Sequence, residues 1–259
     1  MELQNILYEK DAGVRIVTMN SPKTMNSFTQ AMFYDLIAVF DDIAADTEAR
    51  AVVLTGGEKV FAAGGDIALM STTDTLGAEK YATLAGQAIS RIEKLNLPVI
   101  AAISGMALGG GCEMTLACDF RIAAEGAIFG TPEINLGIIP GAGATQRLTR
   151  VVGPGWAKYL IMTGKNIDAE TALQIGLVTQ VVLKENLMDE AKKLAAGLAA
   201  KSPVAMKAAK SCINYSMDVD LASGLAYELK NMAFLFSTED QKEGMKAFLE
   251  KRKAQFIGK

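Results

Sequence analysis

The sequence predicts an α/β protein with a mixed N-terminal core and a helical C-terminal part. Two observations carry this prediction. Short apolar runs typical of buried strands, such as residues 51–55 and 99–103, alternate with helical patterns up to Thr163. From Asp168 onward, amphipathic helical spacing dominates. A chain of 259 residues suits one large core with a smaller appended part. We therefore place the core in residues 1–200 and a helical region in residues 201–259.

The elements are expected in a regular order along the chain. Ile6 to Thr18 alternates around Asp11-Ala12-Gly13 and predicts a β-hairpin. The capping-box spacing of Ser27 and Gln30 predicts the start of a helix. Further helices are expected over 75–95, from the loop after Gly143 to Thr163, and over 185–200, 203–216, 220–236 and 239–254, with strands at 51–55, 99–103, 120–123 and 127–129.

Composition excludes several classes of function. Half of the residues are hydrophobic and the net charge is only −3, so we expect neither a nucleic-acid partner nor a strong electrostatic field around the protein. The first ten residues lack a basic region followed by an apolar core, and no run reaches about 18 apolar residues. We therefore expect no membrane association and a cytoplasmic location.

Cysteine and histidine content narrows the chemistry. The three cysteines contain no CxxC pair, which argues against disulfides and thiolate zinc sites. The chain has no histidine, which excludes Ser-His and Cys-His nucleophile pairs and HExxH metal sites. We expect no metal, and acid–base chemistry must fall to carboxylates, lysine or tyrosine.

The stretch from Pro98 to Asp119 is the predicted centre of the site. An apolar strand leads into Gly109-Gly110-Gly111 and then into an apolar helix that carries Glu113 in its first turn. Glycines at a helix start expose backbone N–H groups to close approach by an oxyanion. Phe61 to Ile67 offers a second glycine loop, in which we expect Asp66 to cap its own short helix.

Two carboxylates near glycine loops suggest acid–base catalysis. No GxxxxGK[ST], GxGxxG or GxSxG motif occurs, so nucleotide-binding and serine-hydrolase interpretations fall away. Taken singly, Glu113 fits a helix terminus and Glu133 a turn. Together they suit a general acid and a general base, beside two N–H groups that stabilise an enolate. Asp119, Arg121 and Arg147 are expected in ion pairs or loop tethers, and Cys112 in apolar packing.

Several ordered motifs resemble the enoyl-CoA hydratase (crotonase) family over almost the whole chain. The resemblance implies a spiral of ββα turns and a C-terminal helical trimerisation region, with assembly as a homotrimer or a dimer of trimers. The motifs are Phe61-Ala-Ala-Gly-Gly-Asp-Ile67, Ala107-Leu-Gly-Gly-Gly-Cys-Glu113, Pro132-Glu133, Gly137-Ile-Ile-Pro-Gly-Ala-Gly143 with Thr145-Gln-Arg-Leu148, and the tail from Thr238 to Arg252.

The resemblance also assigns roles to residues. The substrate would be an acyl-CoA thioester, with no separate cofactor because coenzyme A is part of the substrate. Its carbonyl oxygen would lie between the N–H groups of Gly65 and Gly110. Glu113 would activate water, and Glu133 would deliver a proton to Cα. Further contacts with water or coenzyme A would come from Lys23, Met25, Ala63, Asp66, Ile67, Gly141, Phe248 and Lys251.

This resemblance implies reversible syn hydration of a short trans-2-enoyl-CoA, because the isomerases of the family commonly work with one glutamate. Alternatives are a cyclic or dienoyl-CoA hydratase of aromatic-acid degradation, a Δ3,Δ2-enoyl-CoA isomerase, or an RNA-binding relative, against which the mild acidity argues. Four departures from the family pattern bear on the substrate. They are Gly65 for alanine, Ala68 for lysine, Ala144 for glycine and Met232 for an aromatic residue.

Overall fold

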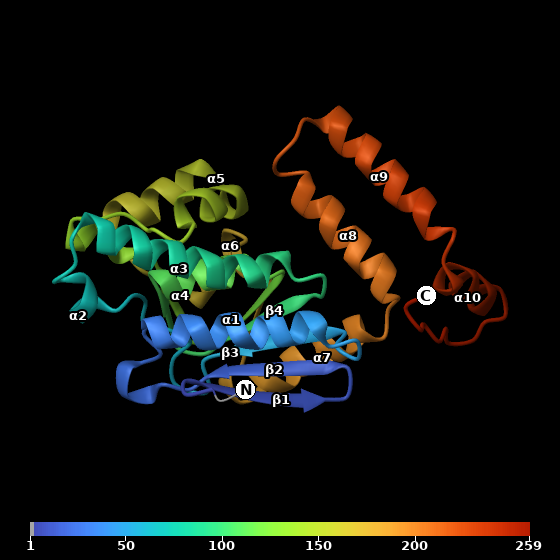
Figure 1. Cartoon of the computed structure of the whole chain (residues 1–259), viewed down its shortest axis with the longest axis horizontal. Coiled ribbons are helices and arrows are strands. Elements are labelled where there is room, and N and C mark those ends of the chain that lie inside the picture. Colours follow the sequence, from blue (N-terminus) through green and yellow to red (C-terminus); the bar gives the residue numbers. More distant parts are fainter. Residues whose placement is uncertain (1–2) are drawn as a thin grey trace.

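The computed structural model describes residues 3–259, and Figure 1 shows the arrangement of their helices and strands. The strands are β1 (Ile6–Asp11), β2 (Val14–Met19), β3 (Ala51–Thr55), β4 (Val99–Ile103), β5 (Met106–Leu108), β6 (Phe120–Ala124), β7 (Ile128–Gly130), β8 (Ile167–Asp168) and β9 (Gln180–Val182). The α-helices are α1 (Gln30–Ala45), α2 (Ile67–Met70), α3 (Thr75–Lys94), α4 (Gly110–Ala117), α5 (Ala144–Thr163), α6 (Ala169–Gln174), α7 (Leu187–Ala199), α8 (Pro203–Tyr215), α9 (Leu221–Leu235) and α10 (Glu239–Leu249). The 3₁₀ helices are η1 (Pro22–Thr24), η2 (Pro132–Leu136) and η3 (Lys184–Asn186).

Two sheets organise the core. The larger sheet has the strand order β1-β2-β3-β4-β6-β9, in which only β1 and β2 pair antiparallel. The smaller sheet has the order β5-β7-β8, with β5 and β7 parallel. Central strands of the larger sheet are buried along their whole length, which explains their continuous apolar runs.

From β4 to β7, consecutive strands alternate between the two sheets, and a helix follows each pair. β4, β5 and α4 form one such unit, and β6, β7 and α5 form the next. A third unit begins with β3 and reaches the smaller sheet through a single parallel bridge between Ala62 and Ala107, before α3. These repeated units are the ββα turns of the predicted spiral.

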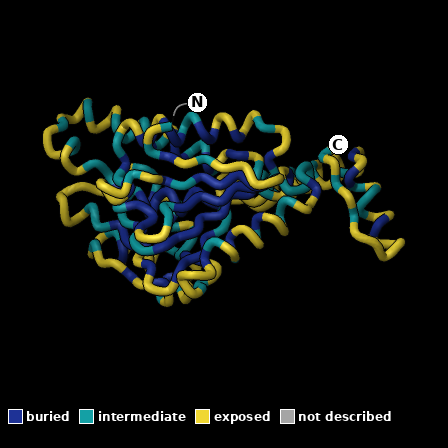
Figure 2. Tube along the Cα trace, turned by 90° about the horizontal axis from the view of Figure 1, so that it is seen from below, coloured by how far each residue is buried: buried dark blue, intermediate teal, exposed yellow. Residues whose placement is uncertain are grey.

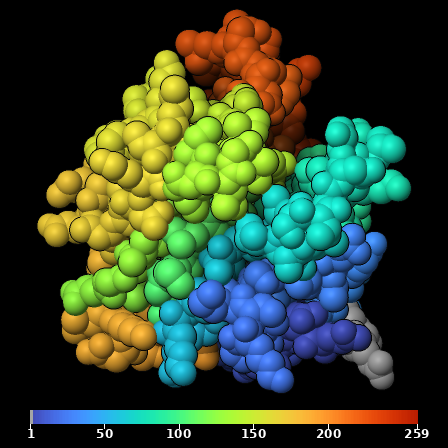
Figure 3. Space-filling model, turned by 90° about the vertical axis from the view of Figure 1, so that its left-hand side faces the viewer, coloured from blue at the N-terminus to red at the C-terminus, as the bar shows by residue number. Residues whose placement is uncertain are grey.

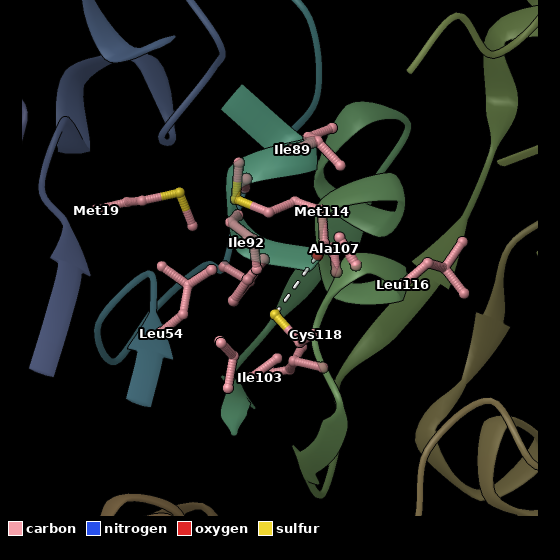
Figure 4. Close-up of a cluster of buried hydrophobic side chains, with 14 of the residues drawn as sticks. Met19, Leu54, Ile89, Ile92, Ile103, Ala107, Met114, Leu116 and Cys118 are labelled. Atoms are coloured by element: carbon pink, nitrogen blue, oxygen red, sulfur yellow. Dashed lines mark hydrogen bonds between the residues drawn. The ribbon is translucent and has the colours of Figure 1, made fainter. Parts of the chain in front are cut away.

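Helices cover both faces of the larger sheet. On one face α1, α3 and α4 enclose the main apolar cluster, part of which is drawn in Figure 4 around Leu54, Ile92 and Met114. On the other face α7 packs Leu187, Ala191 and Ala195 against the strands. Figure 2 shows the buried strands at the centre of the body. Because α4 lies against this core, the helix that carries Glu113 has a rigid support.

The helices α8, α9 and α10 extend away from the sheets as an arm (Figure 1). Lys210 on α8 ties the arm to the core, because its ammonium group contacts Asp119 at 2.7 Å and the Leu97 carbonyl oxygen at 3.0 Å. None of the residues of α9 is buried in this single chain. The arm therefore leaves a large apolar face, including Leu221, Leu225 and Leu229, exposed.

The structure confirms most predicted elements and corrects several details. The cap of α1 is Thr29, whose hydroxyl accepts a hydrogen bond from the Met32 N–H, and not Ser27. The short strands β5, β8 and β9 were not predicted, because two or three residues carry too little periodicity. Helix α10 ends at Leu249 and not at residue 254. The chain from Asp168 onward is mostly helical, as predicted.

Candidate active site

The Gly110 N–H points out of the start of α4. Gly109 adopts φ +51°, and its carbonyl oxygen accepts the helical hydrogen bond from the Glu113 N–H at 3.0 Å. A trans peptide directs its C=O and N–H groups in opposite directions. The Gly110 N–H, which belongs to the same peptide as this carbonyl, therefore points away from the helix and has no intrahelical partner.

The Gly65 N–H is oriented by the same principle. The Gly64 carbonyl oxygen accepts a hydrogen bond from the Phe28 N–H at 2.8 Å, so the Gly65 N–H of that peptide points away from Phe28. The parallel bridge at Ala62 and Ala107 brings the two glycine loops side by side. A Cβ atom placed on Gly64 would lie only 3.7 Å from the Gly110 nitrogen. The segments that carry the two predicted N–H groups are therefore adjacent.

Tyr81 on α3 fixes the Gly65 loop. Its hydroxyl donates to the Phe28 carbonyl oxygen at 2.6 Å and accepts from the Asp66 N–H at 3.1 Å. A Cβ atom on Gly65 would approach the Tyr81 hydroxyl to 3.3 Å and the Met70 sulfur to 3.1 Å. An alanine at this position would therefore require Met70 and Tyr81 to move by a few tenths of an ångström.

Glu113 lies almost completely within the protein, with 3% of its surface exposed. Its Oε1 atom accepts hydrogen bonds from the Ala142 and Ala144 N–H groups, both at 2.9 Å. These donors lie at the start of α5, whose N-cap Gly143 provides no side-chain cap. The carboxylate therefore caps α5 and gains from its dipole. Burial nevertheless raises the pKa of Glu113, although the N–H groups oppose this effect.

Glu133 has different surroundings. It lies in the first turn of η2, and its Oε2 atom is buried without a hydrogen-bond partner among residues 3–259. Burial raises the pKa of Glu133 to about 7, with a further contribution from the charge of Glu113. Its Oε1 atom lies 2.9 Å from where a Gly109 Cβ would be, so the carboxyl group borders the glycine loop.

These groups can work together chemically. A carboxyl with a pKa near neutrality can hold a proton at pH 7 and release it, as a general acid must. The two N–H donors to Glu113 favour its ionised form and oppose the effect of burial on its pKa. The two free N–H groups can hold a developing oxyanion. The arrangement suits proton transfers beside a carbonyl group that becomes an enolate.

The other predicted binding residues fall into two groups. Met25 and Ala63 lie together, since the Ala63 N–H donates to the Met25 carbonyl oxygen at 3.0 Å, and Lys23 precedes them in η1. Asp66 caps α2, as predicted, and Ile67 is exposed at its first position. The blue, cyan and green regions of the chain meet on the face seen in Figure 3, while residues 111–117 of α4 are buried.

Phe248 and Lys251 lie apart from this group. Phe248 is on α10 and is 84% exposed, and Lys251 follows that helix. Figure 1 shows α10 at the opposite end of the chain from α2. Within one chain, the structure therefore does not bring these two residues to Glu113.

The residues expected to be structural do form tethers. Asp119 pairs with Lys210, Arg121 donates to the Leu177 and Cys118 carbonyl oxygens, and Arg147 pairs with Glu93. Cys112 is buried, and burial raises the pKa of its thiol to about 12.

In residues 3–259, no helix has the length and apolar character needed to cross a membrane. The same residues hold no cluster of three or more potential metal ligands.

Sequence reasoning missed two features of this site. The donors to Glu113 are Ala142 and Ala144, whereas the prediction had selected Gly141 of the same loop for backbone contact with water. The sequence pattern predicts only that Tyr81 belongs to an amphipathic helix. The glycine spacing of the 137–143 loop signalled that loop, but neither its N–H directions nor the reach of Tyr81 follows from spacing alone.

The chain is similar in sequence to proteins of one known family. The family described as "Enoyl-CoA hydratase/isomerase" matches residues 9–259. The chain is 47% identical to a short-chain-enoyl-CoA hydratase of Clostridium acetobutylicum over 98% of both sequences. It is 43% identical to a crotonyl-CoA hydratase of Syntrophomonas wolfei over the full length of both.

Solved structures agree with this result. An enoyl-CoA hydratase from Bacillus anthracis superimposes with a TM-score of 0.96 at 40% identity, covering 99% of this chain and all of that one. An enoyl-CoA hydratase from Mycobacterium smegmatis gives a TM-score of 0.94 at 31% identity, covering 98% and 99%. The predicted spiral fold is confirmed.

Proposed function

We propose, because the chain belongs to the enoyl-CoA hydratase/isomerase family, that it catalyses reversible syn addition of water to a short trans-2-enoyl-CoA, giving a 3-hydroxyacyl-CoA. The observation that carries the proposal is the presence of the buried Glu113 and the half-buried Glu133, with different surroundings, beside the outward-pointing N–H groups of Gly65 and Gly110. The names of the two relatives described above support a short acyl chain. The enzyme is thus a hydro-lyase.

The reaction distributes its proton transfers between the glutamates. The Glu113 carboxylate takes a proton from water, whose oxygen forms a bond to C3 of the enoyl group. The electron pair of the C2–C3 double bond moves toward the thioester carbonyl, and the Gly65 and Gly110 N–H groups hold the resulting enolate oxygen. The Glu133 carboxyl then gives its proton to C2, and proton exchange with solvent deprotonates Glu113 and reprotonates Glu133 before the next turnover. One water molecule is added, and the reverse sequence removes it.

The remaining parts of the proposal concern binding and assembly. Lys23, Met25, Ala63, Asp66, Ile67 and Gly141 would contact the thioester or the attacking water, and no separate cofactor would be needed. The exposed apolar face of α9 supports assembly into a homotrimer or a dimer of trimers. Such assembly would allow Phe248 and Lys251 of one copy to serve the coenzyme A of another. The three free cysteines suit a cytoplasmic location.

The test is a substrate profile with linear, long, cyclic and β,γ-unsaturated acyl-CoA thioesters. We expect the fastest turnover with crotonyl-CoA, followed by loss of the enoyl-thioester absorbance and appearance of the 3-hydroxy product. Turnover of a cyclic dienoyl-CoA alone, or isomerisation of a 3-enoyl-CoA without hydration, would replace the proposal with one of those activities. Measurement of the mass in solution tests the assembly.

A further inference from the structure

Arg147, in the first turn of α5, is held by a two-point ion pair. Its Nε atom donates to Oε1 of Glu93 at 2.8 Å, and its Nη2 atom donates to Oε2 at 2.6 Å. Glu93 belongs to α3, so the pair links two helices that border the site. A bidentate pair fixes the plane and direction of the guanidinium group, unlike a single contact.

The remaining arm of the guanidinium reaches the loop before α5. Nη1 donates to the Ala142 carbonyl oxygen at 3.0 Å. The fit is so close that a Cβ atom on Gly143 would overlap Nη1, at a separation of 2.0 Å. Gly143 also has φ +123°, a conformation that residues with side chains rarely adopt. The Arg147 guanidinium group therefore packs directly against the backbone of the loop at Ala142 and Gly143.

This loop supplies the only N–H groups that hold the Glu113 side chain among residues 3–259. The Ala142 N–H and the Ala144 N–H lie on either side of Gly143, and both donate to the same oxygen of Glu113. A continuous set of contacts thus runs from Glu93 through Arg147 and the Ala142 backbone to Glu113.

We infer that Arg147, clamped by Glu93, is a positioning residue that aims the carboxylate of Glu113 by fixing the loop from Ala142 to Ala144. The inference rests on the proposed function for its kinetic test, but its structural content does not. Arg147 makes no hydrogen bond to Glu113 among residues 3–259. Its charge acts to lower the pKa of the Glu113 carboxyl, whereas its positioning effect passes through the backbone of the loop. Even a small displacement of a catalytic group can cost about 100-fold in rate.

The kinetic test compares Arg147→Lys and Glu93→Gln with the parent enzyme. Lysine keeps the charge but cannot hold Glu93 at two points and Ala142 at a third. We expect kcat with crotonyl-CoA to fall roughly 10- to 100-fold in Arg147→Lys, with KM changed by less than about threefold. Glu93→Gln should act in the same direction but less strongly. The matched control is Arg91→Lys, which alters an exposed arginine of the same helix α3 that pairs with Asp41.

A double-mutant comparison separates positioning from general support. If Arg147 acts through Glu113, adding Arg147→Lys to Glu113→Gln should lower kcat by no more than about threefold beyond Glu113→Gln alone. Losses that multiply would overturn the inference. So would a kcat within twofold of the parent in both Arg147→Lys and Glu93→Gln.

Residue-resolved amide hydrogen exchange provides a readout that needs no activity. In Arg147→Lys, the Ala142 and Ala144 amides should exchange faster by about tenfold or more, while amides in the last turns of α5 stay protected. Uniform loosening of α5, or unchanged exchange at Ala142 and Ala144, would contradict positioning. If the parent protein hydrates no enoyl-CoA, the proposed function fails and this exchange experiment alone decides the inference. If Arg147→Lys does not fold, Glu93→Gln is measured in the same way.

Discussion

The two glutamates of the site belong to regions of opposite character. Glu113 is part of α4, which lies against the apolar core, and its carboxylate receives two N–H groups from the start of α5. Glu133 belongs to the short η2 helix, in which Ile134 and Leu136 are exposed, and one of its oxygens has no partner in residues 3–259. The protein therefore stabilises the negative charge of the Glu113 carboxylate with two N–H donors. It provides no donor to the buried Oε2 atom of Glu133 within residues 3–259.

This difference supports the proposed division of the two proton-transfer roles. Both carboxyls are desolvated, so burial alone does not distinguish them. The hydrogen bonds distinguish the two carboxyl groups, because N–H donors favour an ionised carboxylate and an unpartnered oxygen favours the protonated acid. For the proposed hydration near neutral pH, these surroundings favour Glu113 as the base and Glu133 as the acid.

The largest expected effect comes from making either glutamate neutral. Glu113→Gln and Glu133→Gln should each lower kcat for crotonyl-CoA hydration by roughly 10²- to 10⁴-fold, because each removes one proton-transfer group. Glutamine at 113 can still accept the Ala142 and Ala144 hydrogen bonds, so the loop should stay in place. The exposed Glu125→Gln is the control and should retain parent activity. Parent-level hydration by either site variant would break the assignment.

An intermediate effect on kcat is expected from Gly109→Ala, which displaces the carboxyl group of Glu133. The new Cβ atom would lie 2.9 Å from Oε1 of Glu133, so the carboxyl group must move. Gly109 also has φ +51° and ψ −125°, a conformation that residues with side chains rarely adopt, and alanine there costs about 1–3 kcal/mol of stability. We expect kcat to fall about tenfold or more.

Gly126→Ala is the matched control for backbone strain. Gly126 has φ +78°, but a Cβ atom there would meet nothing within 4 Å. Gly126→Ala should lower the melting temperature without lowering kcat. Equal kcat losses in both variants would mean that strain, and not displacement of Glu133, causes the effect.

The same two regions show what a sequence can reveal. The α4 segment was predicted well because its signals are local: an apolar strand, three glycines and an acidic residue one turn later determine both the helix start and the Gly110 N–H direction. The position of Gly65 beside it depends on the bridge between Ala62 and Ala107, which joins residues far apart in the chain. The family resemblance supplied this pairing, and periodicity did not.

Contacts between distant loops account for what was missed. Hydrogen bonds from Ala142 and Ala144 involve backbone groups, and backbone direction leaves no mark in residue type except at Gly143. The hydroxyl of Tyr81 joins Phe28 to Asp66 across three elements, while the sequence around Tyr81 indicates only an amphipathic helix. Arg147 was correctly expected in an ion pair, but its reach to the Ala142 carbonyl required coordinates.

The smallest expected effect is on stability, and it tests the unsupported charge at Glu133 directly. Because the pKa of Glu133 is raised to about 7 in the folded protein, the unfolded chain ionises first as pH rises from about 4.5, and the folded state loses stability until about pH 7. Glutamine imitates the protonated acid at every pH. Glu133→Gln should therefore match the parent below pH 4.5 and exceed it above pH 7. The full shift corresponds to about 3 kcal/mol, which partial solvent screening reduces to ~1–2 kcal/mol.

Denaturant unfolding at several pH values measures this difference, with Glu125→Gln again as the exposed control. A variant less stable than the parent at pH 8 would mean that Glu133 makes a favourable contact in its ionised form, and the contrast between the two glutamates would be wrong. A gain at pH 8 that disappears at pH 4 would instead show that the protein gives up stability to keep a proton on Glu133. Such a cost is expected where a buried acid is retained for catalysis.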